Sequence, residues 1–210
     1  NQSATGGGIE DVLIGGLKYS YALSRKDSLY QKDPVTRHDV NVAGFKVNRG
    51  GELEFGLTYL EKPSRSNAHS GWAITAQHVQ NDFLGGRNKF AVQYGEGSGT
   101  GLGYTGNTQL DNSSKRYRLV EFFDWQVTPR FGGQIEAVYQ KDVRPQGGNQ
   151  HWTSLGVRPA YAISEQFKLV TELGHDQVRA ADGTRTLSKF TFAPTWSPKG
   201  PGFWERPEIR

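Results

Sequence analysis

Apolar and polar residues alternate with a period of two along much of this chain, and this restricts its fold more than any other feature. In one segment Leu53, Phe55, Leu57 and Tyr59 alternate with Glu52, Glu54, Gly56 and Thr58. Successive side chains of a β-strand point to opposite faces, so the pattern predicts strands with one apolar and one polar face. No window shows a competing helical period of 3.6 residues, and an all-β fold follows.

The alternation recurs and predicts ten strands. They are expected at 17–24, 40–48, 52–59, around 72–76, 90–94, 115–125, 134–140, 152–163, 167–176 and around 190–192, and a further one begins at 204–210. Polar loops are expected at 25–37, 61–70, 95–114, 142–149 and 179–186, alternating with short turns, and Asn1–Gly8 is a polar, glycine-rich entry with no apolar core. Short turns at one end and long loops at the other are typical of outer-membrane β-barrels, while soluble sandwiches have strands of about five or six residues.

Composition agrees with a membrane barrel and excludes several other classes. Aromatic residues reach 12%, too many for a disordered chain, although only 35% of the residues are apolar. No stretch of 18 apolar residues predicts a transmembrane helix, but barrel strands give a weaker signal than helices. The absence of cysteine excludes disulfides. The 25 basic and 21 acidic residues are interspersed, so no nucleic-acid partner is expected.

Aromatic and charged residues support this interpretation without deciding it. Tyrosine and tryptophan recur near strand ends, at Tyr19, Tyr59, Trp72, Tyr94, Trp125, Tyr139, Trp152 and Tyr161. They are expected to form the aromatic girdles of a barrel, although aromatic residues also simply favour strands. Opposite the apolar rows lie Lys18, Glu54, Glu136, Lys168, Glu172 and Asp176. In a wide barrel these residues line water and need no buried partner, and in a small soluble barrel they face solvent.

Five segments resemble the maltoporin family, which includes sucrose porins. They are NRGGELEFG at 48–56, GWAITAQH at 71–78, NKFAVQY at 88–94, WTSLGVRPAY at 152–161 and WERPEIR at 204–210, and they occur in the order and spacing of the family. The resemblance implies an eighteen-stranded antiparallel transmembrane β-barrel that assembles as a homotrimer in the bacterial outer membrane. It also implies passive diffusion of maltodextrins or related oligosaccharides, with outer-membrane lipid around the barrel and neither enzymatic chemistry nor a cofactor.

The resemblance further implies that residues 1–210 are a single partial porin domain of about 10–11 strands, without the constriction loop and without the first and last strands of the barrel. An open sheet would carry unpaired edges in lipid, which is not viable. We therefore expect these strands to belong to a longer protein.

The resemblance also assigns candidate site residues. Maltoporins guide sugars along a row of aromatic residues called the greasy slide, and Trp204 matches one of its positions; the alternative is a packing or girdle tryptophan. Arg206, Glu208 and Arg210 are expected to share the strand face of Trp204 and to line the pore. Where the family carries a slide phenylalanine before Asn-Lys-Phe, this chain has Arg87, which would interrupt the slide unless Phe83 supplies a ring. The list of expected pore-lining residues is completed by Arg116 and Arg118, which could instead anchor the membrane interface.

Other functions find little support in the sequence. Gly101, Gly103 and Gly106 fit the spacing GxGxxG, but they lie in a polar loop with no helix after it, so dinucleotide binding is excluded. The five histidines lack metal-ligand spacing, and no catalytic triad or paired acid emerges. The remaining alternatives are a general diffusion porin, an outer-membrane β-barrel enzyme or adhesin, and a soluble carbohydrate-binding β-sandwich.

Overall fold

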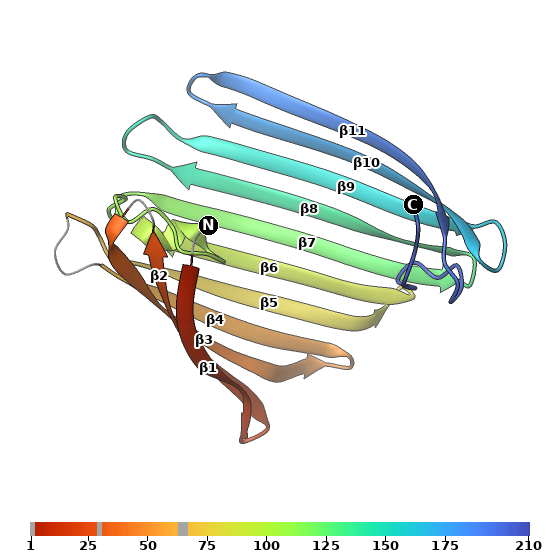
Figure 1. Ribbon diagram of the computed structural model, residues 1–210, viewed down its shortest axis with the longest axis horizontal. Helices are drawn as coiled ribbons and strands as arrows, with labels where there is room; N and C mark the ends of the chain where they lie inside the picture. Colours follow the sequence, from red (N-terminus) through yellow and green to blue (C-terminus); the bar gives the residue numbers. More distant parts are fainter. Residues whose placement is uncertain (1–2, 29–30, 63–66) are drawn as a thin grey trace. The chain divides into compact units, whose positions relative to one another are not determined.

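The computed structural model describes residues 3–28, 31–62 and 67–210, which form an eleven-stranded sheet (Figure 1). Each strand is hydrogen-bonded to the strands that precede and follow it in the chain. The strands are β1 (Ser3–Ile14), β2 (Leu17–Ser28), β3 (Gln31–Asn48), β4 (Gly51–Glu61), β5 (Gly71–Phe83), β6 (Gly86–Glu96), β7 (Lys115–Thr128), β8 (Phe131–Val143), β9 (Gln150–Ala162), β10 (Phe167–Ala180) and β11 (Gly183–Trp196), with a short 3-10 helix η1 (Gly97–Gly101). The all-β antiparallel prediction is confirmed. No helix among the described residues is long and apolar enough to cross a membrane.

The strand β1 was not expected from the sequence. Residues 1–2 of the segment Asn1–Gly8 lie outside the described residues, but the chain is paired with β2 from Ser3 onwards, and Gly6 lies opposite Ser24. Three consecutive glycines have no side chains with which to alternate. Backbone hydrogen bonding can therefore form a strand that leaves no period-two pattern in the sequence.

Two predicted loops are also largely strand. In place of the loop 25–37, β2 continues to Ser28 and β3 begins at Gln31, with residues 29–30 outside the described part. In place of the loop 179–186, a turn at 181–182 joins β10 to β11. Few apolar residues occur in these parts of the sequence, so a search for apolar and polar alternation does not find the ends of these strands. The loop 61–70 agrees with the prediction, although residues 63–66 are outside the described part.

The strand expected at 204–210 is wrong. This segment consists of turns and bends, and its only strand-like pairing among the described residues is a single bridge between Trp196 and Ile209. The residues between these two fold back instead of extending the sheet. The alternation in WERPEIR therefore does not represent a strand.

The chain divides into two compact units. Unit 1 comprises residues 1–78, 91–119 and 140–150, and unit 2 comprises 79–90, 120–139 and 151–210. In unit 1 the apolar face of β4 carries Phe55 and Leu57, which are 40% and 47% exposed. On the opposite face, Asp39 accepts hydrogen bonds of 2.6 Å from both Arg37 and Thr58. The predicted division into an apolar and a polar face is confirmed for these strands.

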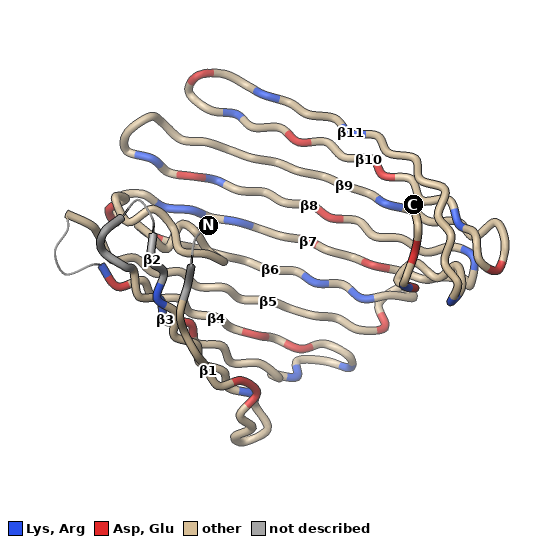
Figure 2. Tube along the Cα trace, in the orientation of Figure 1, with Lys and Arg blue, Asp and Glu red and all other residues tan. Residues whose placement is uncertain are grey.

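Unit 2 has the same two-faced character. Leu173 of β10 lies between Val157 of β9 and Phe190 of β11 on the apolar face, where it is 50% exposed. The neighbouring Glu172 points to the other face and pairs with Arg158. Figure 2 shows that charged residues lie along the lengths of these strands as well as at their turns. At this level β9, β10 and β11 thus present apolar side chains on one face and charged side chains on the other.

Aromatic clusters occur in both units. In unit 1 the Tyr94 ring lies 5.3 Å from Trp72 and 4.9 Å from Tyr117, next to the loops that follow β6 and precede β7. In unit 2 the Phe123 ring lies 5.7 Å from Phe83 and 5.6 Å from Trp125, next to the short turns. Aromatic rings near strand ends are typical of the aromatic girdles of membrane barrels.

Candidate functional site

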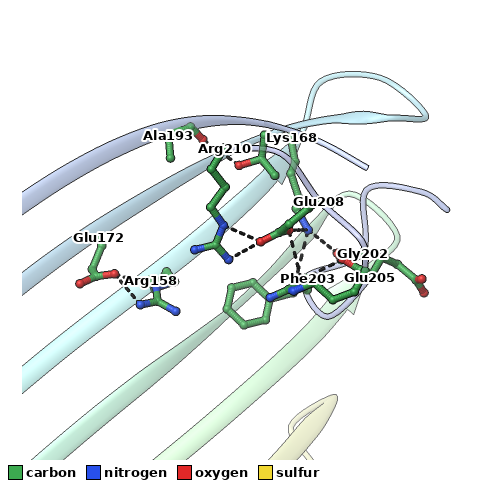
Figure 3. A network of polar contacts seen from close by, with 11 residues as sticks. Arg158, Lys168, Glu172, Ala193, Gly202, Phe203, Glu205, Glu208 and Arg210 are labelled. Atoms are coloured by element: carbon green, nitrogen blue, oxygen red, sulfur yellow. Dashed lines mark hydrogen bonds and ion pairs between the residues drawn. The ribbon is translucent and has the colours of Figure 1, made fainter. Parts of the chain in front are cut away.

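The segment after β11 folds onto the polar face of unit 2 (Figure 3). Its Phe203 side chain is 5% exposed and packs against Ala160, Val170 and the partly buried Ala193. The Phe203 backbone amide donates a hydrogen bond of 2.8 Å to the side-chain oxygen of Gln126. We call residues 197–210 the inner segment, because it covers small residues on the polar face that would otherwise be exposed to water.

A buried ion pair holds the inner segment in place. The Lys168 ammonium lies 3.0 Å from the Glu208 carboxylate, and the two side chains are 1% and 6% exposed. The same ammonium donates a hydrogen bond of 2.7 Å to the Gly202 carbonyl oxygen. Arg206, at 3.1 Å, and Arg210 also contact the Glu208 carboxylate. Three cations therefore surround one carboxylate.

Glu208 stays ionised because of these cations. Burial acts to raise the pKa of its carboxyl group, but hydrogen bonds with Lys168 and Arg210 outweigh this effect and hold the pKa below its ordinary value of 4.5. The carboxylate is thus inaccessible, whereas Arg206 and Arg210 remain 44% and 40% exposed. Their guanidinium groups are available to a solute, but the predicted common strand face with Trp204 is not formed.

Trp204 is the exposed aromatic residue of the inner segment. Its side chain is 52% exposed, and its ring stands edge-on to Phe203 with the centroids 4.9 Å apart. The anchored Phe203 therefore supports a tryptophan that remains open to solvent. This arrangement differs from a packing tryptophan, which would be buried.

Arg87 of β6 pairs with the face of β7 that anchors the inner segment. Its guanidinium is 3.3 Å from the Asp124 carboxylate, and Gln126, which binds Phe203, is the next residue on that face. The Arg87 side chain is 45% exposed. Phe83 does not supply a ring here, because it packs on Phe123, on the opposite face of β7 from Asp124.

Farther along the polar face of unit 2 lies a second charged group. Arg158 binds Glu172 at 2.6 Å, and Lys189 binds the other oxygen of Glu172 at 2.7 Å. Beyond them the Trp152 indole nitrogen donates a hydrogen bond of 3.1 Å to Asp176. Trp152 therefore faces the charged side of β9, and its predicted place in an aromatic girdle is wrong.

In unit 1 three arginines surround a pair of acceptors. Arg116 binds Asp142 through two hydrogen bonds of 2.7 and 3.0 Å, and Arg144 binds the same carboxylate at 3.0 Å. Arg118 donates two hydrogen bonds of 2.8 and 2.7 Å to the Gln140 side-chain oxygen. Gln140 in turn donates to Asp142 at 3.1 Å. Arg116 and Arg118 thus join one network on the polar face of β7.

Tyr104 adds an exposed ring to this arginine network. Its side chain is 59% exposed, and its hydroxyl lies close to the Arg116 guanidinium. It belongs to the loop between β6 and β7, in which Leu102 is buried and Gly97 and Ser114 are joined by a backbone hydrogen bond of 2.9 Å. The sequence did not single out Tyr104, and it assigned Trp152 to a girdle instead of to the polar face. The orientation of Trp152 could have been predicted from its even-numbered spacing to Arg158, because residues two apart on a strand share a face. Nothing in the sequence predicts the orientation of Tyr104.

These surfaces combine two kinds of group that suit sugars. Aromatic rings present flat apolar faces, while guanidinium and carboxylate groups exchange hydrogen bonds with hydroxyls. Each unit holds an exposed ring near arginines, namely Tyr104 in unit 1 and Trp204 in unit 2. Among the described residues no group of three or more His, Cys, Asp and Glu side chains is placed to hold a metal ion.

A comparison with protein families agrees with this chemistry. The family model described as LamB porin matches residues 1–210, which is the whole chain. The match covers both units and the inner segment. It therefore includes every residue of the surfaces described above.

Proposed function

The chain belongs to the LamB porin family, whose members are sugar-conducting β-barrel channels of bacterial outer membranes and are typically trimers. From this premise we propose that it contributes the wall of a channel for passive diffusion of maltodextrins or related oligosaccharides. Sugar rings slide over Trp204, and charged side chains of the polar face exchange hydrogen bonds with their hydroxyls.

The observation that carries this proposal is the exposed Trp204 on an anchored support. The ring is 52% exposed, so its flat apolar face is open to a sugar ring. Its backbone is held by the Lys168–Glu208 pair and by Gln126, so the ring needs little reorganisation to bind. Pre-organised rings bind with a smaller loss of conformational entropy.

The neighbouring charges complete the proposed sugar path. Arg206 and Arg210 are half-exposed donors beside Trp204, and Arg87 is another on the same face of unit 2. In unit 1, Arg116 and Arg118 are proposed to act in the same way beside Tyr104. Trp152 with Asp176 offers a further ring and acceptor pair. None of these groups forms a nucleophile and base pair, which supports a channel without enzymatic activity.

We also propose that the chain resides in the bacterial outer membrane as one sector of a closed barrel within a homotrimer. The strands β1 and β11 stand at the two ends of the strand order. Unpaired backbone groups along such edges are strongly unfavourable in lipid. Further strands that pair with these edges would satisfy them.

The test is planar-bilayer conductance of the full-length parent protein, titrated with maltohexaose and then with sucrose. Saturable block of the ion current is expected with maltohexaose. Trp204→Ala should weaken this block about tenfold, since one aromatic contact contributes on the order of 1 kcal/mol or more. Tyr161→Ala is the matched control, because Tyr161 is equally exposed, at 53%, but lies on the apolar face of the same unit.

Three outcomes would change the proposal. Equal block in wild type and Trp204→Ala would remove Trp204 from the path. Steady conductance without block would favour a general diffusion porin. The observation that supports this alternative is Arg87, which occupies a position where the family carries an aromatic residue of the slide. If the protein forms no channel, the result would favour the alternative of an outer-membrane β-barrel enzyme or adhesin.

A further inference from the structure

The apolar face of unit 2 changes character abruptly towards the turn between β10 and β11. Leu173 lies between Val157 and Phe190, so this row across β9, β10 and β11 is apolar. In the next row His175 lies between Leu155 and Ser188. Two further rows on the same face are entirely polar, formed by Thr153, Gln177 and Thr186 and then by His151, Arg179 and Thr184.

These polar rows line a hollow. A cavity of about 640 Å³ is bounded by Tyr139, His151, Thr153, Leu155, His175, Gln177 and Arg179. No carboxylate lines it, and the Arg179 guanidinium has no ion-pair partner among the residues that the structure describes. On the polar face of the same unit, by contrast, Arg158 and Lys189 share Glu172. The hollow therefore carries an uncompensated positive charge.

The hydrogen bonds in the hollow leave donors directed at its space. Tyr139 Oη lies 3.0 Å from His151 Nδ1, and Ser188 Oγ lies 2.9 Å from His175 Nδ1. When each Nδ1 accepts from its hydroxyl, each Nε2 carries the proton and can donate. Two imidazoles, a guanidinium and the Gln177 amide then form a set of donors suited to an oxyanion with several acceptor oxygens.

The position of the hollow along the strands indicates the depth in the membrane at which its ligand lies. A tilted membrane strand crosses the hydrocarbon layer in about ten residues. Counted along β10 from Phe167, which is exposed at the opposite end, this length reaches the row of Gln177. Arg179 then lies at the level of the lipid headgroups, at the end of the strands from which the longer loops of the chain emerge.

We propose that this hollow binds the phosphate of a lipid headgroup in the leaflet on the loop side of the membrane. Arg179 supplies the charge, the two histidines and Gln177 supply further donors, and Leu155 and Tyr139 contact the adjoining apolar part of the lipid. This site goes beyond sugar conduction and requires only that the strands are inserted in a membrane.

The experiment uses the full-length parent protein in phosphatidylcholine nanodiscs that contain increasing amounts of phosphatidic acid, with retained lipid counted by native mass spectrometry. Arg179→Gln is expected to weaken phosphatidic acid binding about tenfold, because it removes a charge-assisted bidentate donor. Thr153→Trp fills the hollow without changing its charge and should reduce binding as well. Arg185→Gln is the matched control, because it removes the same charge near the same turn from an exposed pair with Asp182.

Specific results would overturn the proposal. Equal retention of phosphatidic acid by wild type and by both the Arg179→Gln and Thr153→Trp variants would remove the site. Displacement by an equal concentration of inorganic phosphate would identify a free anion as the occupant instead of a lipid. A disulfide that forms efficiently between Thr153→Cys copies in the membrane would show that a second copy of the chain covers this face.

Discussion

Lys168 and Glu208 form a buried ion pair of 3.0 Å between β10 and the inner segment. A buried pair of this kind contributes little net stability compared with apolar packing, but breaking it leaves a charge without a partner. Its importance here is positional. It fixes the backbone of the inner segment, and thereby the place of Trp204, on the polar face of unit 2.

Glu208→Gln should therefore release the inner segment. Removing the carboxylate leaves the Lys168 ammonium buried beside two arginines, with an expected loss of about 3–5 kcal/mol in the local free energy of opening. Hydrogen exchange of residues 197–210 measures this quantity. The double variant Lys168→Met with Glu208→Gln should be less destabilised than Glu208→Gln alone. Equal exchange rates in wild type and Glu208→Gln would contradict this role.

The inner segment should also loosen in acid. Because the pKa of Glu208 is lower in the folded protein than its ordinary value of 4.5, ionisation of this carboxyl stabilises the folded state above that pH. The contribution is lost as the pH falls below 4.5 and through the folded pKa. Protease cleavage within 197–210 should be constant between about pH 5 and 8 and should rise below this window. A rise that begins near neutral pH would implicate another group.

Arg87→Phe should strengthen sugar binding. The substitution places a ring on β6 beside Asp124, on the polar face where Gln126 of β7 anchors the inner segment, and it removes the 3.3 Å pair with Asp124. We expect block by maltohexaose to strengthen several-fold, consistent with about 1 kcal/mol for an added aromatic contact. Arg87→Gln, which removes the ion pair but adds no ring, should give no such gain. If both variants strengthen the block, the lost charge is responsible instead of the ring.

Asp142→Asn should make the channel more selective for anions. The Asp142 side chain is 4% exposed and compensates Arg116 and Arg144, so its neutralisation leaves these arginines and Arg118 without a carboxylate. The reversal potential in a salt gradient should shift towards the anion equilibrium potential. We expect a stability loss of about 2 kcal/mol from the weakened charge-assisted hydrogen bonds. An unchanged reversal potential would show that this arginine network does not contribute to the ion selectivity of the channel.

Gly99→Ala should disrupt the loop between β6 and β7. An added Cβ would lie 2.0 Å from the Trp72 carbonyl oxygen, which is a clash with backbone that has no room to relax. Overpacking of this kind costs about 1–3 kcal/mol, and protease cleavage between residues 102 and 114 should increase. Gly103→Ala is the control, because nothing lies within 4 Å of its added Cβ. Similar cleavage in the two variants would show that the loop tolerates the shift.

The glycines of this loop show why a short motif can mislead. Gly101, Gly103 and Gly106 fit a phosphate-binding spacing, but a Cβ on Gly106 would lie 2.0 Å from the Ser98 carbonyl oxygen. Glycine is thus required at 106 for close backbone packing within the loop. The spacing alone does not explain the glycine, because the reason for it is a backbone contact that spacing does not report.

The features that the sequence by itself determined are those that depend on the local geometry of a β-strand. Alternation with a period of two depends only on the pleat of a strand, so it revealed the all-β fold, the two-faced strands and the short turns without any knowledge of the chain's path. It failed at β1, where consecutive glycines have no side chains to alternate. It also failed at the ends of β2, β3, β10 and β11, where few apolar residues occur although backbone pairing continues. The alternation also predicted that Lys168 faces water, whereas its side chain is buried against Glu208.

Only the tertiary structure decided which of these side chains meet. The return of the inner segment buries Lys168 under Glu208, leaves Trp204 exposed and turns WERPEIR away from a strand. Pairing between neighbouring strands likewise gathers His151, His175 and Arg179 on one face. A contact between distant residues depends on where the backbone returns, and the alternation of neighbouring residues carries no information about that path.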